Sequence, residues 1–281
     1  MPVSVSPTVI PFDDIIARHN VDAIFALQIS GLPYIFSNWR APQKWTITSA
    51  VNLDGEVYDW LPILNLGKNF AQVSTKVEPK AGLGDCGNLS FSLKLPGTQK
   101  DTLGNALLSV LTNAVFRTDG KNSMSLTSEL EVDDTGSKVL SFYSNPYPTT
   151  GDVPDFLYFG TETITVNSVS SVSSTAISAN ISRGAFKSQR KYHTGAVTGG
   201  DKANGGGYIV ADYPLVLEGR IARLWMIPGE FSRQNTTWSF RPFSANFSSG
   251  GENKLIYAGI VDGVSEDVTY ATVRTSSIDR L

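Results

Sequence analysis

Residues 88–95 read NLSFSLKL, and they decide the fold class because apolar and polar residues alternate along them. The apolar residues are Leu89, Phe91, Leu93 and Leu95. Ser90, Ser92 and Lys94 stand between them, so the two sets fall on opposite sides of an extended chain. A period of two residues is typical of a half-buried β-strand. The segment therefore predicts a strand with one face in the core.

Strand signals of this kind dominate the rest of the chain. We predict further strands over residues 23–29, 44–51, 158–166, 176–181, 208–210, 215–225, 237–243, 254–261 and 267–274. The Ser/Val tract at 167–174 predicts a flexible hairpin or an edge strand. The polar, proline-containing residues 117–155 predict an exposed excursion between packed modules.

One helix is expected among the strands, over residues 99–115. Apolar residues recur there at spacings of three and four, which forms one stripe along a helix. A stripe without an apolar far side predicts a helix that lies on the outside of a sheet.

These signals predict a mainly β protein of two β-barrel or β-sandwich modules with one amphipathic helix packed on a sheet. Residues 1–20 are expected to form an N-terminal arm, with prolines at 2, 7 and 11, and a short helix. The first barrel is expected over residues 21–134, with its helix at 99–115, and the second barrel over 135–281.

Composition excludes several classes of protein. The 281 residues include 23 basic and 26 acidic ones, so the net charge is −3, whereas proteins that bind duplex DNA usually have a basic surplus. Cys86 is the single cysteine, which excludes an internal disulfide and a cysteine-based zinc site. His19 and His193 are too few for a multi-histidine metal site. The sequence shows no signal peptide and no apolar run that would span a bilayer, so we expect folding in a reducing cytoplasm.

No arrangement of residues predicts catalysis. His19 and His193 are expected to be surface or hydrogen-bonding residues rather than bases. The acid pairs at 13–14, 133–134 and 266–267 read as solvated acids of turns or helix starts. The glycine-rich loop at 199–207 lacks a phosphate-loop ending. The basic residues Lys187, Arg190 and Lys191 predict a solvated or subunit-facing patch. We therefore predict no enzyme and assign no catalytic, cofactor-binding or metal-binding residue.

The stretch from Gly160 to Trp225 contains the motifs GTETITV, SRGAF, YHTGA and LEGRIARLW. They resemble a pattern in tail-tip and baseplate hub proteins of tailed bacteriophages, which include the distal-tail family. In that pattern a Gly-Thr/Ser-Glu-x-Ile-Thr strand precedes an Arg-Gly turn, a histidine and a Gly-Arg strand. The matching residues here are Gly160, Glu162, Ile164, Arg183, Gly184, His193, Gly219 and Arg220.

The C-terminal stretch IYAGIVDGVSEDVTYATVRTSSIDRL resembles a strand pair and short terminal helix of the same hubs, with Gly259 and residues 278–281 in the matching places. The sequence departs from the pattern after the Arg-Gly, where Ala185 and Phe186 replace the usual Gly-Thr. It also ends at Leu281, where a hub would often continue. A compact hub, a distal-tail relative and part of a longer protein all stay open.

The resemblance implies a structural component of a tail tip or baseplate hub that links the tail tube to the tip or spike. It implies that the two barrels of each chain are tail-tube-like and that copies of the chain form a ring around the DNA ejection channel, with a trimer preferred over a hexamer. Expected partners are a distal tail or tail tube protein and the tip, spike or fibre proteins, with DNA only passing through the lumen. The expected location is the virion tail, after assembly in the bacterial cytoplasm. The resemblance brings no catalytic role and no cofactor.

Two other hypotheses stay open. A receptor- or carbohydrate-binding β module at the tail periphery is the first alternative, and exposed aromatic residues on one face would favour it. A wall-degrading enzyme is the second, and it would need an acid whose replacement abolishes cell-wall hydrolysis.

Overall fold

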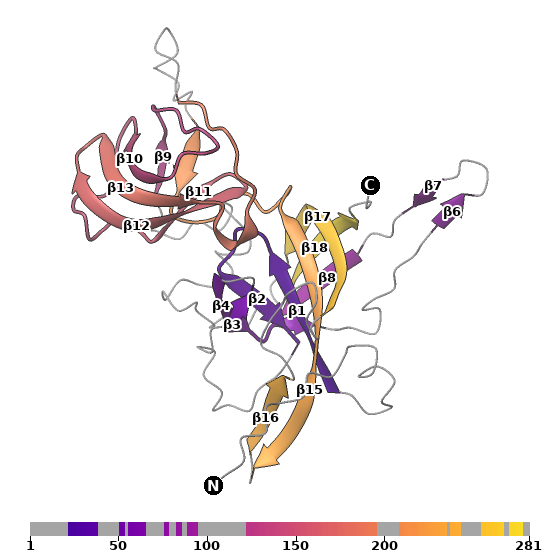
Figure 1. Cartoon of the computed structure of the whole chain (residues 1–281). Coiled ribbons are helices and arrows are strands. Elements are labelled where there is room, and N and C mark those ends of the chain that lie inside the picture. Colours follow the sequence, from indigo (N-terminus) through magenta and orange to yellow (C-terminus); the bar gives the residue numbers. More distant parts are fainter. Residues whose placement is uncertain are drawn as a thin grey trace.

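The computed structural model describes residues 22–38, 51–53, 56–65, 76–78, 83–85, 89–94, 122–195, 208–234, 237–242, 254–266 and 270–277. These residues form a mainly β structure, as the sequence predicts (Figure 1). The predicted arm over 1–20, the helix over 99–115 and the loop over 199–207 lie outside the described residues. Within the described part, the helical structure is a short 3₁₀ turn, η2, at Ala185–Lys187.

The larger sheet has ten strands and curls into a nearly closed barrel, which we call the barrel. Its main path runs β3-β4-β2-β1-β15-β17-β18-β8-β5, and β16 pairs with β15 beside that path. The strands are β1 (Asp22–Ile29), β2 (Tyr34–Ser37), β3 (Val51–Leu53), β4 (Glu56–Leu61), β5 (Leu64–Asn65), β8 (Leu89–Lys94), β15 (Ile221–Gln234), β16 (Thr237–Pro242), β17 (Lys254–Glu266) and β18 (Tyr270–Ser277). β6 (Lys76–Glu78) and β7 (Leu83–Asp85) form a separate pair.

The smaller sheet has six strands in the order β10-β13-β12-β11-β14-β9 and forms a half-barrel. Its strands are β9 (Ser123–Ser125), β10 (Gly136–Ser141), β11 (Phe156–Phe159), β12 (Glu162–Val172), β13 (Ala176–Arg183) and β14 (Ile209–Ala211). Every pair in it is antiparallel. In Figure 1 it lies beside one end of the barrel.

The half-barrel is an insertion in the barrel. The chain leaves the barrel after β8, forms the whole half-barrel, and returns to the barrel at β15. The two ends of the insertion meet, because the backbone amide and side-chain amide of Asn122 donate hydrogen bonds of 3.1 and 3.2 Å to the Asp212 carboxylate. The sheets thus divide the chain differently from the expected modules 21–134 and 135–281: β9 belongs with β10, and β15 to β18 return to the first sheet.

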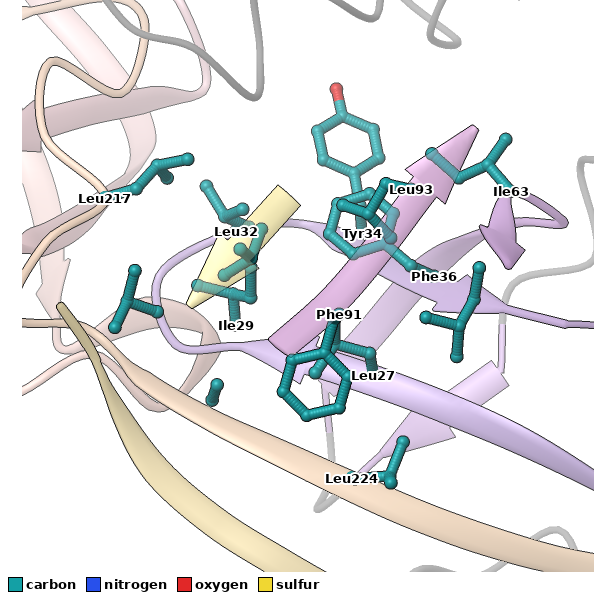
Figure 2. Close-up of a cluster of buried hydrophobic side chains, with 14 of the residues drawn as sticks. Leu27, Ile29, Leu32, Tyr34, Phe36, Ile63, Phe91, Leu93, Leu217 and Leu224 are labelled. Atoms are coloured by element: carbon teal, nitrogen blue, oxygen red, sulfur yellow. The ribbon is translucent and has the colours of Figure 1, made fainter. Parts of the chain in front are cut away.

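Each sheet has its own core. Inside the barrel, side chains from strands far apart in sequence meet, among them Leu27 of β1, Phe91 of β8 and Leu224 of β15 (Figure 2). The predicted alternation in β8 is confirmed, since Leu89, Phe91 and Leu93 are buried while Ser90 is exposed. The half-barrel core is formed by side chains between residues 124 and 210 alone. A third cluster lies where the two sheets meet.

Two strand predictions are wrong. The predicted strand 158–166 is a hairpin, because Gly160 with φ +56° turns the chain between β11 and β12. The predicted strand 215–225 begins only at Ile221. The Ser/Val tract fits its hairpin alternative, as the end of β12 and the turn into β13.

The exposed excursion predicted over residues 117–155 is also wrong in its described part, from residue 122 onward. That part contains β9 and β10 and places Leu126, Leu140 and Phe142 in the half-barrel core. Its many polar residues lie between these few buried apolar ones, so the composition of the segment does not indicate that it contributes to a core.

Candidate functional site: the joint between barrel and half-barrel

Residues of the first motif stretch, between Gly160 and Arg220, converge in space at the end of the half-barrel that faces the barrel. Of the C-terminal stretch, Gly259 lies in β17, and residues 278–281 lie outside the described residues. Gly160 lies in the turn between β11 and β12, and Glu162 is the first residue of β12. Arg183 is the last residue of β13, and Arg220 directly precedes β15. These residues form two buried polar clusters, one around Glu162 and one around Arg220.

Glu162 and Arg183 form a bidentate ion pair. The Arg183 Nε donates to Glu162 Oε1 at 2.6 Å, and its Nη2 donates to Oε2 at 2.8 Å. Both side chains are fully buried. The same guanidinium donates to the backbone carbonyls of Glu131 and Lys191. Arg183 therefore connects β12 to two segments that are distant in sequence, as its fixed fork of donors allows.

His193 completes the cluster around Glu162. Its Nε2 lies 2.8 Å from Glu162 Oε2, which also accepts a hydrogen bond of 2.9 Å from the Lys191 amide. The His193 backbone exchanges two hydrogen bonds of 3.0 Å with Leu130. Its Nδ1 is buried without a hydrogen-bond partner. We therefore assign the proton to Nε2, because a protonated Nδ1 would be a buried donor with no acceptor.

Glu162 stays ionised at neutral pH. Burial alone would raise the pKa of its carboxyl, but hydrogen bonds from Arg183, His193 and the Lys191 amide lower it below its ordinary value. A carboxylate held in this way by donors of the protein is stabilised as an anion rather than poised to accept a proton. The cluster is thus suited to holding segments together and not to acid–base chemistry.

Arg220 is the centre of the second cluster and is almost fully buried. Its guanidinium donates to three backbone carbonyls: Val216 at 2.8 Å, Ser30 at 2.9 Å and Gly160 at 2.8 Å. Burial lowers the pKa of Arg220 to about 10, so the group is still charged at neutral pH. Because Ser30 follows β1 and Gly160 belongs to the half-barrel, this one side chain bridges the two sheets.

The turn formed by Ser30 and Gly31 fits into the half-barrel. Gly31 has φ +78°, and its amide donates to the Phe186 carbonyl at 2.7 Å. Its own carbonyl accepts a hydrogen bond of 2.7 Å from Thr163 Oγ1. A Cβ at Gly31 would lie 2.0 Å from Arg220 Nη1 and 2.8 Å from Thr163 Oγ1, so only glycine fits without a shift. We call these contacts, together with those of Arg220, the joint.

Tyr208 lies between the two clusters. Its ring centroid is 4.5 Å from that of His193, and a Cβ at Gly160 would lie 2.4 Å from its hydroxyl. Burial raises the pKa of Tyr208, the Glu162 carboxylate adds to the increase, and the Arg220 charge opposes it. The phenol therefore stays protonated and connects the clusters through packing.

The joint also has an apolar side. Phe186 lies in the 184–188 loop that follows β13, and its ring makes edge contacts with Tyr58 of the barrel at 5.4 Å and with Phe156 of β11 at 4.9 Å. Phe186 and Ala185 belong to one buried cluster with barrel residues that include Trp60 and Trp225. This loop is thus the part of the half-barrel that packs on the barrel's outer surface.

Other residues named from the sequence contribute no side chain to the two polar clusters. Asp133 and Asp134 lie in a turn, where Asp134 pairs with Lys138 and accepts the Glu131 amide. The side chains of Lys187, Arg190 and Lys191 are exposed, which fits both the solvated and the subunit-facing alternative, while the Lys191 backbone belongs to the cluster around Glu162. His19, the acids at 13–14 and the side chains of the acid pair at 266–267 lie outside the described residues.

The sequence motifs identify part of this site. Glu162, Arg183 and His193 were named through the resemblance, and the structure brings them into contact. The Ser30–Gly31 pair lies directly after the predicted strand 23–29, and no motif marks this pair or Thr163 as part of a site. The signal that could have found them is weak, since a glycine after a buried strand usually indicates no more than a turn.

The chemistry available here is that of a structural network. Among the residues that the structure describes, no group of three or more His, Cys, Asp or Glu side chains could hold a metal ion. In the same part of the chain no helix is long and apolar enough to cross a membrane. Comparison with protein-family models, curated proteins and solved structures gave no match.

Proposed function

We propose that the chain is a structural component of a bacteriophage tail tip or baseplate hub, which links the tail tube to the tip or spike. The observation that supports this most is the convergence of the residues that carry the resemblance. Residues spread from position 160 to position 220 form two buried clusters close together, one around Glu162 in the half-barrel and one around Arg220 between the two sheets. A shared framework is expected to preserve the residues that fix its geometry.

The proposed mechanism is mechanical. Copies of the chain form a closed ring around the DNA ejection channel, with apolar surface and strand edges buried between neighbours. Exposed apolar side chains are available on both sheets, with Ile256 and Ile260 on β17 of the barrel and Val139 and Tyr143 in or next to β10 of the half-barrel. A trimer is the expected ring and a hexamer is its alternative.

The oligomeric state tests this proposal. We expect the purified chain to form complexes of three or six copies in mass photometry, with an annular outline in negative-stain images. Variants with Asp in place of Ile256 or Ile260 report whether the β17 surface lies between copies, and Glu230→Lys, at an exposed polar position of β15, is the control. A chain that stays monomeric at the highest soluble concentration would contradict the ring.

A peripheral receptor- or carbohydrate-binding module is the second candidate. The observation that favours it is the exposure of two tyrosines in the half-barrel, Tyr143 at 65% and Tyr192 at 44%. Aromatic faces of this kind can stack on sugar rings. Glycan-array binding by the full chain that is lost in Tyr143→Ala or Tyr192→Ala would favour this candidate over the ring.

A further inference from the structure

The joint rests on a loop with an unusual backbone. Phe186 has φ 53° and ψ 41°, and Lys187 has φ 58°, so two successive non-glycine residues lie in the left-handed region. Bulky residues rarely adopt this conformation, and it persists only where the surroundings impose it. Here the imposing contacts are those of Phe186 with Tyr58, with Phe156 and with the Gly31 amide.

Each sheet keeps its own core without this loop. The half-barrel core lies within residues 124–210, and the barrel core is formed by other residues. The hydrogen bonds between Asn122 and Asp212 hold the ends of the insertion together on the half-barrel side. Loss of the contacts of Phe186 would therefore remove neither sheet's interior. It would remove the main apolar contact that orients one sheet against the other.

We propose that the 184–188 loop is a strained latch, which fixes the orientation of the half-barrel on the barrel and can open while both sheets stay folded. The strain at Phe186 and Lys187 lowers the free energy needed to release it. Arg220 and Thr163 contact the same Ser30–Gly31 turn, so they align the sheets when the latch is closed. This inference goes beyond the proposed function, because it concerns one chain and holds in any assembly.

Distances between the sheets test the latch. Spin labels are placed at two exposed polar positions outside the proposed contact surfaces, Ser168→Cys in the half-barrel and Glu230→Cys in the barrel, in a chain that carries Cys86→Ser. Pulsed electron–electron double resonance on the full chain, diluted into excess unlabelled protein, is expected to give one narrow distribution of distances between the labels. Phe186→Ala is expected to add a second, broader population, while hydrogen exchange at Leu157 and Ile181 in the half-barrel core stays slow.

A matched variant separates the latch from general instability. Ile177→Ala makes a cavity in the half-barrel core at the far end of β13 from the joint, so it should lower the melting temperature and leave the narrow distance distribution unchanged. The latch is overturned by a broad distribution in the unmutated chain or by an unchanged distribution in Phe186→Ala. It is also overturned if exchange becomes fast throughout the half-barrel in Phe186→Ala, or if Ile177→Ala gives the same second population.

Discussion

Gly31 and Gly136 have nearly the same backbone torsion, with φ of +78° and +77°, but different surroundings. A Cβ at Gly31 would meet Arg220 Nη1 at 2.0 Å, whereas a Cβ at Gly136 would meet nothing within 4 Å. The pair therefore separates the cost of a left-handed backbone from the cost of filling the joint.

Gly31→Ala is expected to destabilise the chain much more than Gly136→Ala. The left-handed conformation costs an alanine about 1–2 kcal/mol at either position. At Gly31 the overlap with Arg220 adds about 1–3 kcal/mol more. Urea denaturation of both variants measures the difference, and equal losses of unfolding free energy would show that the joint can accommodate a Cβ at Gly31 without overlap.

The Glu162 carboxyl predicts how stability depends on pH. Its pKa is lowered in the folded chain, so its contribution is fully present above the ordinary value of 4.5 and is lost as the pH falls below it. In Glu162→Gln this acid-dependent loss should become smaller. At pH 7 the variant should be less stable by about 3 kcal/mol, because Arg183 keeps a buried charge without its partner.

Thermal unfolding between pH 3 and pH 7 measures both effects. Asp152→Asn is a suitable control, because Asp152 bonds only its own exposed turn at Thr149 among the contacts described. If Glu162→Gln lost stability on acidification as steeply as the unmutated chain, the assigned role of Glu162 would be wrong.

Among the elements, β8 shows most directly how the sequence pattern becomes core. Phe91 is fully buried between strands of the barrel, and the neighbouring Ser90 points to solvent. Phe91→Ala is expected to lower the unfolding free energy by about 3–5 kcal/mol through lost burial and the cavity it leaves. Ser90→Ala should change it by less than about 0.5 kcal/mol. Denaturant midpoints of the two variants check this, and similar midpoints would contradict the assigned faces.

The same strand shows what the sequence can predict at this scale. The alternation of apolar and polar residues in β8 matches their burial, because this strand has the core on one side and solvent on the other. The prediction for the segment 158–166 was wrong because residues on both arms of the tight hairpin are buried, including the polar Glu162 and Thr163, so Gly160 is the one residue that indicates the turn. The sequence also could not show that the 184–188 loop is left-handed at Phe186, since aromatic residues do not usually indicate such a turn.

At the scale of the whole molecule, the arrangement of sheets depends on contacts that no local pattern encodes. β1 pairs with β15 over its full length, although the entire half-barrel lies between them in sequence. Periodicity indicates that both are strands but does not indicate which strands pair. The sequence therefore predicts two consecutive modules, 21–134 and 135–281, rather than an insertion. The resemblance pointed to Glu162 and Arg220, but only the fold shows that they flank one joint.

The insertion itself should fold alone. A fragment of residues 122–213 keeps the half-barrel core, the Glu162–Arg183 ion pair and the contact between its ends at Asn122 and Asp212. We expect dispersed amide resonances and a cooperative thermal transition from this fragment. Asp212→Ala should weaken it by removing the contact between its ends, and a fragment without a cooperative transition would show that the barrel is needed for the half-barrel to fold.

The measurement that tests the central claim most directly is a cryo-electron microscopy reconstruction of a tailed phage particle that contains this chain. The account predicts a closed ring of barrels at the tail tip, three or six copies around the channel, with the half-barrel held on each barrel at the joint around Gly31 and Arg220. Single copies out on the fibres, or a chain found nowhere in the tail, would contradict it.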